Sequence, residues 1–381
     1  MAPTQFRVLI AGGGVAALEA VLTLQELDED RSLHVEVIAP ESRFVYRPLS
    51  VRDPFGPRAT RSYELRPLVE GAGAELRHGQ IDAVEPDERF VTLGDGTRLD
   101  YDALLLATGV LRQPAIRGVS TFAGVADAPA FKSFVDALRR GAYRRVAFIV
   151  PPGPTWPLPM YELALQAATR LRCLSPQSRD GIQMAVISPE REPLEAFGPV
   201  ASRAVRAVLN DHGVTMHPGT YVDALAGGEL RLDMPGAVQV DAAWAAPRLV
   251  ARAPAGVPRG ADGFVPVDGA SRVDGFIDLF AAGDMTVSPA KQGGVAAQQA
   301  AAAAHAIGAL AGIAAEPEPV PPVLRAMLLT GGEPLWLRYD PAADTPSEAS
   351  YEPLWWPPHK IFGEHLAPVL AERYSVSSSR P

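Results

Sequence analysis

The sequence predicts an α/β fold of doubly wound parallel sheets, because a strand-helix-strand pattern occurs twice along the chain. Parallel neighbouring strands require a crossover of this kind. The second strands of the two copies end alike, in VIAPE and VISPE, so we interpret the copies as two Rossmann-like dinucleotide-binding units. The expected elements lie at 6–11, 15–27 and 35–39 in the first copy and at 146–150, 160–172 and 182–187 in the second.

The segments around these copies predict how the units are divided along the chain. Alternating residues over 75–99, broken by GDG at 94–96, indicate short antiparallel strands, and 103–107 indicates another strand. A helix is expected at 130–138, and a long, alanine-rich apolar helix at 295–315. We expect a first nucleotide-binding domain in two parts, a second one between them, and a C-terminal region entered through a Pro/Glu-rich linker. The expected boundaries are 1–125, 126–250, 251–315 and 316–381, with the linker at 316–322.

Charge and cysteine content exclude several kinds of function. The formal net charge is −9, and no basic run could follow a phosphate backbone, so nucleic acid is not expected as a partner. The first strand begins too near the N-terminus for a signal sequence to precede it, which favours the cytoplasm. Cys173 is the single cysteine, which excludes a dithiol within one chain. No histidine pair has the spacing of a helical zinc site, so no metal site is expected.

The first strand leads into a glycine-rich turn, Gly12-x-Gly14-x-x-Ala17, that opens the first helix. The first glycine permits the tight turn, the second lets a pyrophosphate approach the backbone, and the small Ala17 allows close packing of helix on strand. Val15 and Ala16 lie between Gly14 and Ala17 and belong to the same predicted cofactor-binding turn. Glu41, just after the second strand, either accepts a ribose hydroxyl or is simply solvated.

Two further motifs extend this reading to a known superfamily. YDALLLATG, ending in Ala107, Thr108 and Gly109, and GFIDLFAAGD, ending in Gly283 and Asp284, resemble signatures of two-dinucleotide-fold flavoproteins. These include the pyridine nucleotide-disulfide reductases, type II NADH dehydrogenases and sulfide:quinone oxidoreductases. The resemblance implies that the glycine turn binds FAD and that Asp284 holds the ribityl chain. As the residue before a helix, Asp284 could also serve as its N-cap.

The chain most resembles the sulfide:quinone oxidoreductase and type II NADH dehydrogenase branch. FVYRPLSV, containing Arg47 and Pro48, is similar to a loop beside the flavin in that branch. AKQGGVAAQQA resembles the segment after the FAD aspartate, which implies that Lys291, Gln292 and Gly293 face the flavin ring and raise its reduction potential. The alternative for Lys291 is a solvated residue at a helix start.

The second unit departs from the glycine pattern at VPPGPTWPLP, residues 150–159. Prolines remove the backbone donors that would bind a pyrophosphate, and Trp156 fills cofactor space, so NAD(P)H is disfavoured there. Cys173 has no neighbouring thiol, and we expect it to be a buried, small apolar residue rather than a reactive one. Tyr161 and Glu162 are candidates for substrate binding or proton exchange. For Glu162, an ordinary role in the first turn of a helix is favoured.

An aromatic tail segment offers candidates for an acceptor pocket. Trp355, Trp356 and Phe362 resemble the branch's C-terminal segment near a quinone pocket and the membrane surface, although core packing is the commoner role for such aromatic residues. Pro368 is expected to interrupt the tail helix. The acidic balance argues against adhesion to an anionic membrane, so a cytoplasmic location is favoured over a peripheral one.

The sequence therefore leads to three functional hypotheses. The first is an FAD-dependent oxidoreductase that lacks redox cysteines and passes electrons from a small-molecule donor to a quinone, oxygen or a partner protein. The second is an NAD(P)H:acceptor oxidoreductase of the type II NADH dehydrogenase kind. The third is a flavin-bearing binding or assembly protein. No oligomeric state is predicted.

Overall fold

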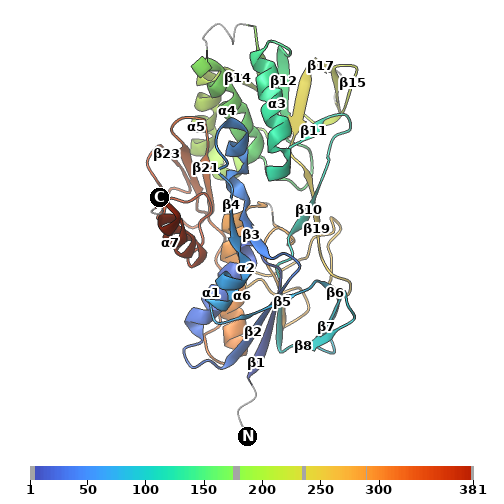
Figure 1. Ribbon diagram of the computed structural model, residues 1–381, viewed down its shortest axis with the longest axis vertical. Coiled ribbons are helices and arrows are strands. Elements are labelled where there is room, and N and C mark those ends of the chain that lie inside the picture. Colours follow the sequence, from blue (N-terminus) through green and yellow to red (C-terminus); the bar gives the residue numbers. More distant parts are fainter. Residues whose placement is uncertain (1–4, 175–180, 234–236, 289, 379–381) are drawn as a thin grey trace.

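Two five-stranded parallel sheets stand one above the other along the longest axis of the molecule (Figure 1). The computed structural model describes residues 5–174, 181–233, 237–288 and 290–378. Elements of the first sheet occupy the lower part of Figure 1 and those of the second the upper part, while the last three strands and α7 lie along one side. The α/β class and the two Rossmann-like units predicted from the sequence are confirmed.

The first sheet is centred on β1, and every pair of neighbouring strands in it is parallel. Alternate residues of β1 serve two cores: Val8 and Ile10 pack toward the helices, whereas Leu9 packs against an antiparallel sheet on the other face. Its strands, in spatial order, are β20 (Leu279–Ala281), β9 (Ala103–Leu106), β1 (Phe6–Ala11), β2 (Leu33–Ala39) and β5 (Glu75–His78).

The helical face of this sheet is covered mainly by α1 (Val15–Leu27) and α6 (Gly293–Leu310), which pack closely together. Small side chains on both helices, such as Ala20 and Ala300, are fully buried at this interface. Short side chains let two helix backbones approach closely. Packing against α1 therefore explains the alanine-rich composition of α6, and insertion into a membrane is not needed to explain it. The short helix α2 (Leu65–Glu70) completes the layer.

The second sheet repeats the arrangement of the first around β12. In each sheet the central strand has the next strand in sequence on one side and a returning strand on the other, so VIAPE and VISPE end equivalent strands. Its strands, in spatial order, are β11 (Ser120–Thr121), β18 (Ala242–Ala245), β12 (Arg145–Ile149), β13 (Gln183–Ile187) and β14 (Val214–His217). Its helices are α3 (Ala128–Arg139), α4 (Leu158–Leu174) and α5 (Gly198–Asp211).

Smaller antiparallel elements connect and cover the two sheets. The pair β10 (Val110–Gln113) and β19 (Arg248–Ala251) runs between them. The remaining elements are β3 (Arg43–Tyr46) with β4 (Arg61–Glu64); β6 (Ile81–Glu85), β7 (Phe90–Leu93) and β8 (Arg98–Asp100); β15 (Val222–Ala226), β16 (Glu229–Leu232) and β17 (Ala237–Gln239); and the 3₁₀ helices Arg47–Phe55, Val125–Asp127 and Glu195–Phe197.

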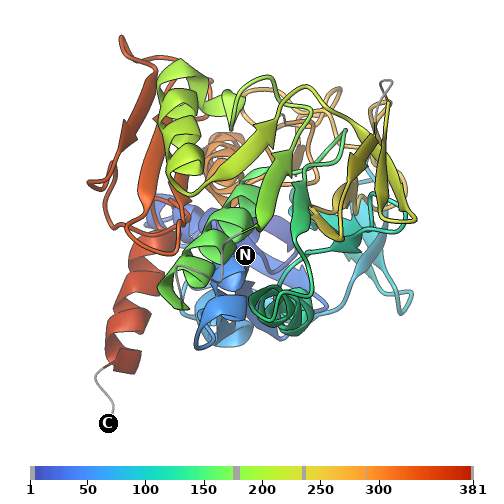
Figure 2. The same ribbon diagram turned by 90° about the horizontal axis from the view of Figure 1, so that it is seen from above.

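The C-terminal region contains a sheet that the sequence reading missed. Strands β21 (Leu324–Leu328), β22 (Leu335–Tyr339) and β23 (Ser347–Ser350) form an antiparallel meander that packs on α4 and α5. Helix α7 (Leu366–Ser378) follows and runs outward from the body (Figure 2). Residues 316–322 carry no helix or strand, as expected of a linker.

Three sequence expectations about local structure are wrong. Segment 75–78 joins the first sheet as its parallel edge strand, and only 81–100 forms the antiparallel hairpin system. Pro368 does not interrupt α7, because it lies in the first turn, where the missing amide is not needed. Cys173 is exposed rather than buried, since it lies on the outer side at the end of α4. Cys173 is the single cysteine of the chain, so its exposure provides no second thiol with which it could pair in the same chain.

Helix α7 is anchored to α1 through Glu19, a buried carboxylate on an otherwise apolar face. Its two oxygens accept hydrogen bonds from the backbone amides of His365 and Leu366, each at 2.9 Å. These are among the amides that a helix start leaves without an internal partner.

We therefore expect Glu19→Ala to destabilise the protein by about 2 kcal/mol, because two buried amides lose their acceptor. Urea unfolding measures this change, and limited proteolysis reports release of α7. The control is Glu26→Ala, which removes an exposed partner of the His365 ring and should cost less than about 0.5 kcal/mol. Equal costs for the two variants would contradict this role of Glu19.

Candidate active site

The turn after β1 has the geometry of a phosphate-binding loop. Gly12 has φ +125°, and a Cβ there would lie 2.3 Å from the carbonyl oxygen of Ala107, so only glycine fits. Gly14 is the N-cap of α1, has an extended backbone and makes no side-chain cap. A Cβ at Gly14 would meet no atom within 4 Å. The first amides of α1 therefore face open space and are available to an anion.

A cavity of about 300 Å³ opens in front of this turn, which we call the glycine-loop cavity. Ala17 does not line it and is buried in the core beneath, as its packing role requires. The candidate residues that do line it are Gly12, Gly14, Val15, Ala16, Glu41, Arg47, Pro48, Ala107, Thr108, Gly109, Gly283, Asp284 and Gly293. Four segments distant in sequence thus converge on one cavity.

Ion pairs at this cavity involve arginines that the sequence reading did not single out. Arg252 lies 3.8 Å from Glu41, and Arg112 lies 3.9 Å from Asp284. Burial raises the pKa of Asp284, while Arg112 and two further basic side chains lower it. Neither arginine belongs to a recognisable motif, and each is brought to the cavity only by the pairing of β10 with β19.

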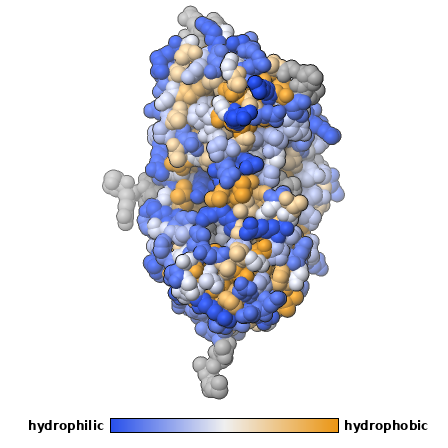
Figure 3. Space-filling view, turned by 90° about the vertical axis from the view of Figure 1, so that its right-hand side faces the viewer, coloured by the Kyte–Doolittle hydropathy of each residue, from blue (hydrophilic) through white to orange (hydrophobic). Residues whose placement is uncertain are grey.

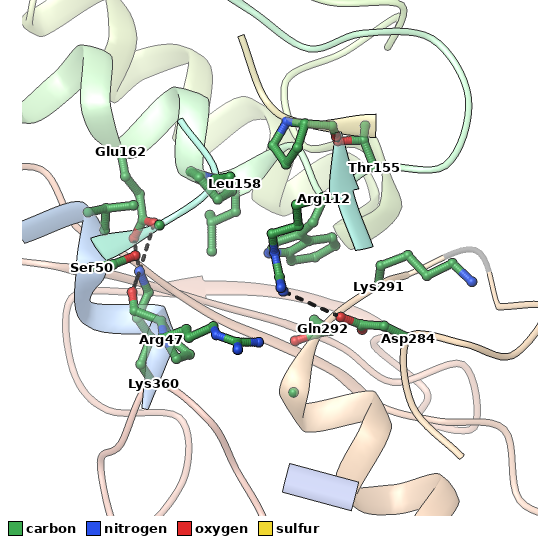
Figure 4. Close-up of a pocket in the computed structure, with 18 of the residues that line it drawn as sticks. Arg47, Ser50, Arg112, Thr155, Leu158, Glu162, Asp284, Lys291, Gln292 and Lys360 are labelled. Carbon is green, nitrogen blue, oxygen red and sulfur yellow. Dashed lines mark hydrogen bonds and ion pairs between the residues drawn. The ribbon is translucent and has the colours of Figure 1, made fainter. Parts of the chain in front are cut away.

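A second cavity of about 180 Å³ adjoins the first between the two parallel sheets and the C-terminal region (Figure 4). We call it the junction cavity. Its walls come from the first 3₁₀ helix, the loop before α4, β21 and the Lys360 segment, and it shares Arg47, Arg112, Asp284 and Gly293 with the glycine-loop cavity. Together the two cavities reach the size typical of cofactor and substrate sites.

A buried ion pair between Lys360 and Glu162 forms one wall of the junction cavity (Figure 4). The Lys360 Nζ lies 2.6 Å from one Glu162 oxygen and 2.7 Å from the other, and it also donates to the carbonyl of Pro48. The backbone amide of Leu329 donates to the same carboxylate. Burial raises the pKa of Glu162 and lowers that of Lys360.

The expected role of Glu162 in a first helical turn is therefore wrong. Helix α4 begins at Leu158, so Glu162 is past its first turn, and its side chain is completely buried against Lys360. The carboxylate has no exposed surface and is paired with one cation, so it does not act on the dipole of the helix; its part in proton exchange stays a prediction. Sequence reasoning placed Lys360 in the tail segment that resembles the branch's C-terminal segment near a quinone pocket, but it missed the pairing with Glu162, because nothing local reveals a partner so distant in the chain.

Tyr161 points away from the junction cavity and into the second unit. Its hydroxyl donates to Glu190 at 2.7 Å, and Ser188 donates to the same oxygen at 2.9 Å. Glu190 ends the VISPE segment, at the position equivalent to Glu41 in the first unit. Desolvation raises the pKa of Glu190 to about 7, whereas the two hydroxyl donors lower it.

The candidate aromatic residues are separated rather than gathered into one pocket. Trp156 lines the junction cavity and packs against Phe197. Trp355 is buried against Trp336, and Trp356 is 79% exposed, so neither lines the cavities described. The alternative of core packing is confirmed for Trp355. Phe362 lies under the guanidinium of Arg325, 4.3 Å from it.

Lys291 and Gln292 line the junction cavity rather than the glycine-loop cavity. The Lys291 ammonium donates to the carbonyl of Thr286 and lies 3.7 Å from the Phe264 ring centroid, turned away from Arg47 and Arg112 (Figure 4). Burial lowers its pKa to about 8. The solvated alternative is wrong, since only 6% of Lys291 is exposed, and its action on a flavin stays a prediction.

The Gln292 amide nitrogen is buried and has no hydrogen-bond partner. An unpaired buried donor in a cavity wall is placed to serve a bound group. Together with the open Gly14, the uncapped α1 amides and Asp284, it forms a set of groups that would hold FAD. FAD would supply two-electron chemistry there.

A small apolar pocket lies beyond the junction between the two cavities. It is lined by Tyr46, Leu49, Tyr63 and residues of α7, and Ile361 contributes to it and to both larger cavities. On the face shown in Figure 3, apolar patches are small and separated by hydrophilic residues. In the described part of the chain no helix is long and apolar enough to cross a membrane, and no cluster of potential metal ligands occurs.

The raised pKa of Glu190 predicts a definite pH dependence of stability. Because the folded carboxyl holds its proton more tightly than the unfolded one, its stabilisation is complete below about pH 4.5 and is lost as pH rises through about 7. Glu190→Gln, which cannot ionise, should therefore gain thermal stability relative to the native protein between pH 5 and 8. Paired melting curves measure this difference, and a pH-independent difference would contradict the assignment.

Comparison with known proteins agrees with this architecture. A family model described as pyridine nucleotide-disulphide oxidoreductase matches residues 6–306. An NADH dehydrogenase-like protein of Mycobacterium tuberculosis is 26% identical over 298 residues, which cover 74% of this chain and 73% of that protein.

Two solved structures share the fold. The sulfide:quinone oxidoreductase of Aquifex aeolicus matches with a TM-score of 0.80 and 20% identity over 97% of this chain and 90% of that one. The NDH2 of Plasmodium falciparum in complex with NADH matches with a TM-score of 0.58 and 16% identity over 74% of this chain and 64% of that one. The chain belongs to the pyridine nucleotide-disulphide oxidoreductase family and is an FAD-dependent oxidoreductase.

Proposed function

We propose that the protein oxidises a small-molecule donor in the junction cavity and passes the electrons through FAD to a quinone-type acceptor. The observation that carries the proposal is the direct joining of the two cavities at Asp284 and Gly293, with no thiol between them. Cys173 lies exposed at the end of α4 and lines neither cavity. Donor and flavin therefore exchange a hydride or electrons without a covalent sulfur intermediate.

A donor that gives up a hydride also releases a proton, and the Lys360–Glu162 pair accepts this proton. Burial raises the pKa of Glu162 and lowers that of Lys360. The neutral form of the pair and the ion pair therefore approach each other in energy. A proton can then move between Nζ and the carboxylate over 2.6 Å as charge changes in the cavity. Arg47, directed into the space between Lys360 and Asp284 (Figure 4), stabilises negative charge there.

The apolar pocket at α7 is our candidate for the acceptor site. Tyr46 and Tyr63 offer aromatic surface, Leu366 and Leu370 of α7 offer aliphatic surface, and Ile361 places the pocket next to both larger cavities. A quinone needs such a surface for its ring and a short path to the flavin. Oxygen or a partner protein would not need this pocket.

An NAD(P)H donor is the second candidate, because the M. tuberculosis relative is named an NADH dehydrogenase-like protein. Two features of this chain speak against it. Prolines occupy the loop where amides would hold the pyrophosphate. The carboxylate in the ribose position, Glu190, is already bonded to Tyr161 and Ser188.

The donor proposal is tested by anaerobic reduction of the purified flavoprotein with NADH, NADPH, sulfide and quinols. We expect slow or no bleaching of the flavin by either nicotinamide. With the donor that reduces it, Glu162→Gln should slow reduction by about 10²-fold through loss of the proton-exchanging group. Cys173→Ser is the control and should leave the rate unchanged. Rapid bleaching by NADH would favour the second candidate, and a strong effect of Cys173→Ser would overturn direct transfer.

FAD binding at the glycine turn is tested by a substitution that should preserve the stability of the fold but weaken the binding of the cofactor. Gly14→Asp places a favoured N-cap carboxylate at α1, so the stability of the apoprotein should be kept or raised. The same carboxylate would occupy the α1 amides and repel a pyrophosphate, weakening FAD binding by at least about 100-fold, or ~2.7 kcal/mol. Gly14→Asn, a neutral cap of equal size, is the control and should weaken it less. Unchanged FAD affinity in Gly14→Asp would show that no phosphate binds there.

A further inference from the structure

The junction cavity carries more positive charge than its own carboxylates balance. Five basic side chains line it, against the two carboxylates Glu162 and Asp284. Each carboxylate already has a basic neighbour, Lys360 for the first and Arg112 for the second. In the described part of the chain, the other three basic side chains have no carboxylate within ion-pairing distance. The Lys291 ammonium donates to the carbonyl of Thr286 instead, which leaves the two arginines, Arg47 and Arg325.

Arg325 is the less readily explained of the two. Arg325 lies on β21 and lines only the junction cavity, at the side away from the glycine turn. Arg47, by contrast, also lines the glycine-loop cavity. The Arg325 Nε is buried without a hydrogen-bond partner, and its guanidinium rests on the Phe362 ring. Its neighbour in register on β22 is another arginine, Arg338. Burial and this like charge lower the pKa of Arg325, whereas the negative charge of Asp340 raises it.

Such an arrangement is costly in the absence of a ligand. An unpaired buried donor gives up its hydrogen bonds to water without replacement, and the penalty is larger when the group is charged. Arg338 avoids this cost, because it pairs with Glu348 and Asp340 on its own sheet. Arg325 forms no ion pair in the described part of the chain, although it is only partly buried and the charge of Asp340 acts on it from further away. Its guanidinium is therefore available to a molecule that enters the cavity.

The other wall of the cavity is apolar. Val51, Phe122, Trp156 and Leu158 line it, and they come from different segments of the chain. A ligand that satisfies both walls has an anionic end and an apolar or aromatic body. A planar guanidinium held on an aromatic ring matches a carboxylate in a two-point contact.

We infer that the electron donor of this enzyme is a small organic acid whose carboxylate is bound by Arg325, which is thereby a specificity-determining residue. The inference rests on the proposed function only in identifying the occupant of the junction cavity as the donor. Phe362 holds the guanidinium in place, and Arg47 adds attraction from the flavin side.

Calorimetric titration of the purified FAD-loaded protein tests the inference, with benzoate as the probe and benzamide as its neutral analogue. We expect benzoate to bind at least about tenfold more tightly than benzamide at constant ionic strength. Arg325→Gln should weaken benzoate binding by about tenfold or more and leave benzamide binding unchanged. Arg325→Lys keeps the positive charge but cannot make a two-point contact with a carboxylate. Its affinity for benzoate should lie between those of the native protein and of Arg325→Gln.

The control variant is Arg206→Gln, which removes an arginine of α5 that pairs with Glu192 and does not line the junction cavity, and it should leave benzoate binding unchanged. Equal affinities for benzoate and benzamide, no benzoate binding, or an Arg325→Gln variant with native affinity would each overturn the inference. The flavin absorbance of the same samples separates the two proposals. FAD-loaded protein that binds benzoate through Arg325, but whose flavin is bleached by no donor in the anaerobic reduction experiment, would refute the proposed function and leave the anion site standing.

Discussion

The buried ion pair between Lys360 and Glu162 is the interaction on which the arrangement of the site depends. It connects the segment before α7, helix α4 of the second unit, the loop at Pro48 and the end of β21 through one ammonium and one carboxylate. A buried pair of this kind adds little net stability over apolar residues, but removing one partner strands a charge and costs about 3–5 kcal/mol. The pair therefore fixes how the four segments meet, and with them the walls of the junction cavity.

The two parallel units carry different loops on the same arrangement of strands. In the first unit, Gly12 and Gly14 leave the amides of α1 facing a cavity, and Glu41 reaches only an arginine. In the second, the equivalent loop is rich in proline, and Glu190 is held by Tyr161 and Ser188. The fold is retained because strand pairing and core packing do not require the loop. Binding capacity at the loop depends on its free backbone donors.

Electrostatics gives the junction cavity its chemical character. A carboxylate paired with a buried lysine, two arginines without a carboxylate partner and an unpaired amide donor surround a space with one apolar wall. In such a low-dielectric setting each charge acts more strongly than in water. Negative charge on a reduced cofactor and on an acidic substrate would both be stabilised there, which couples binding to reduction.

The sequence by itself determined the two β-α-β units, the turn at Gly12 and Gly14 and the exclusion of dithiol chemistry. These follow from local periodicity, from the backbone freedom of glycine and from the presence of one cysteine, none of which needs a distant contact. Only the tertiary structure decided the role of Glu162, the core position of Trp355 and the exposure of Cys173. It also revealed Arg112, Arg325 and the β21–β23 sheet. The reason is physical: the character of a buried charge is set by its partner, and Lys360 lies 198 residues from Glu162 in the chain.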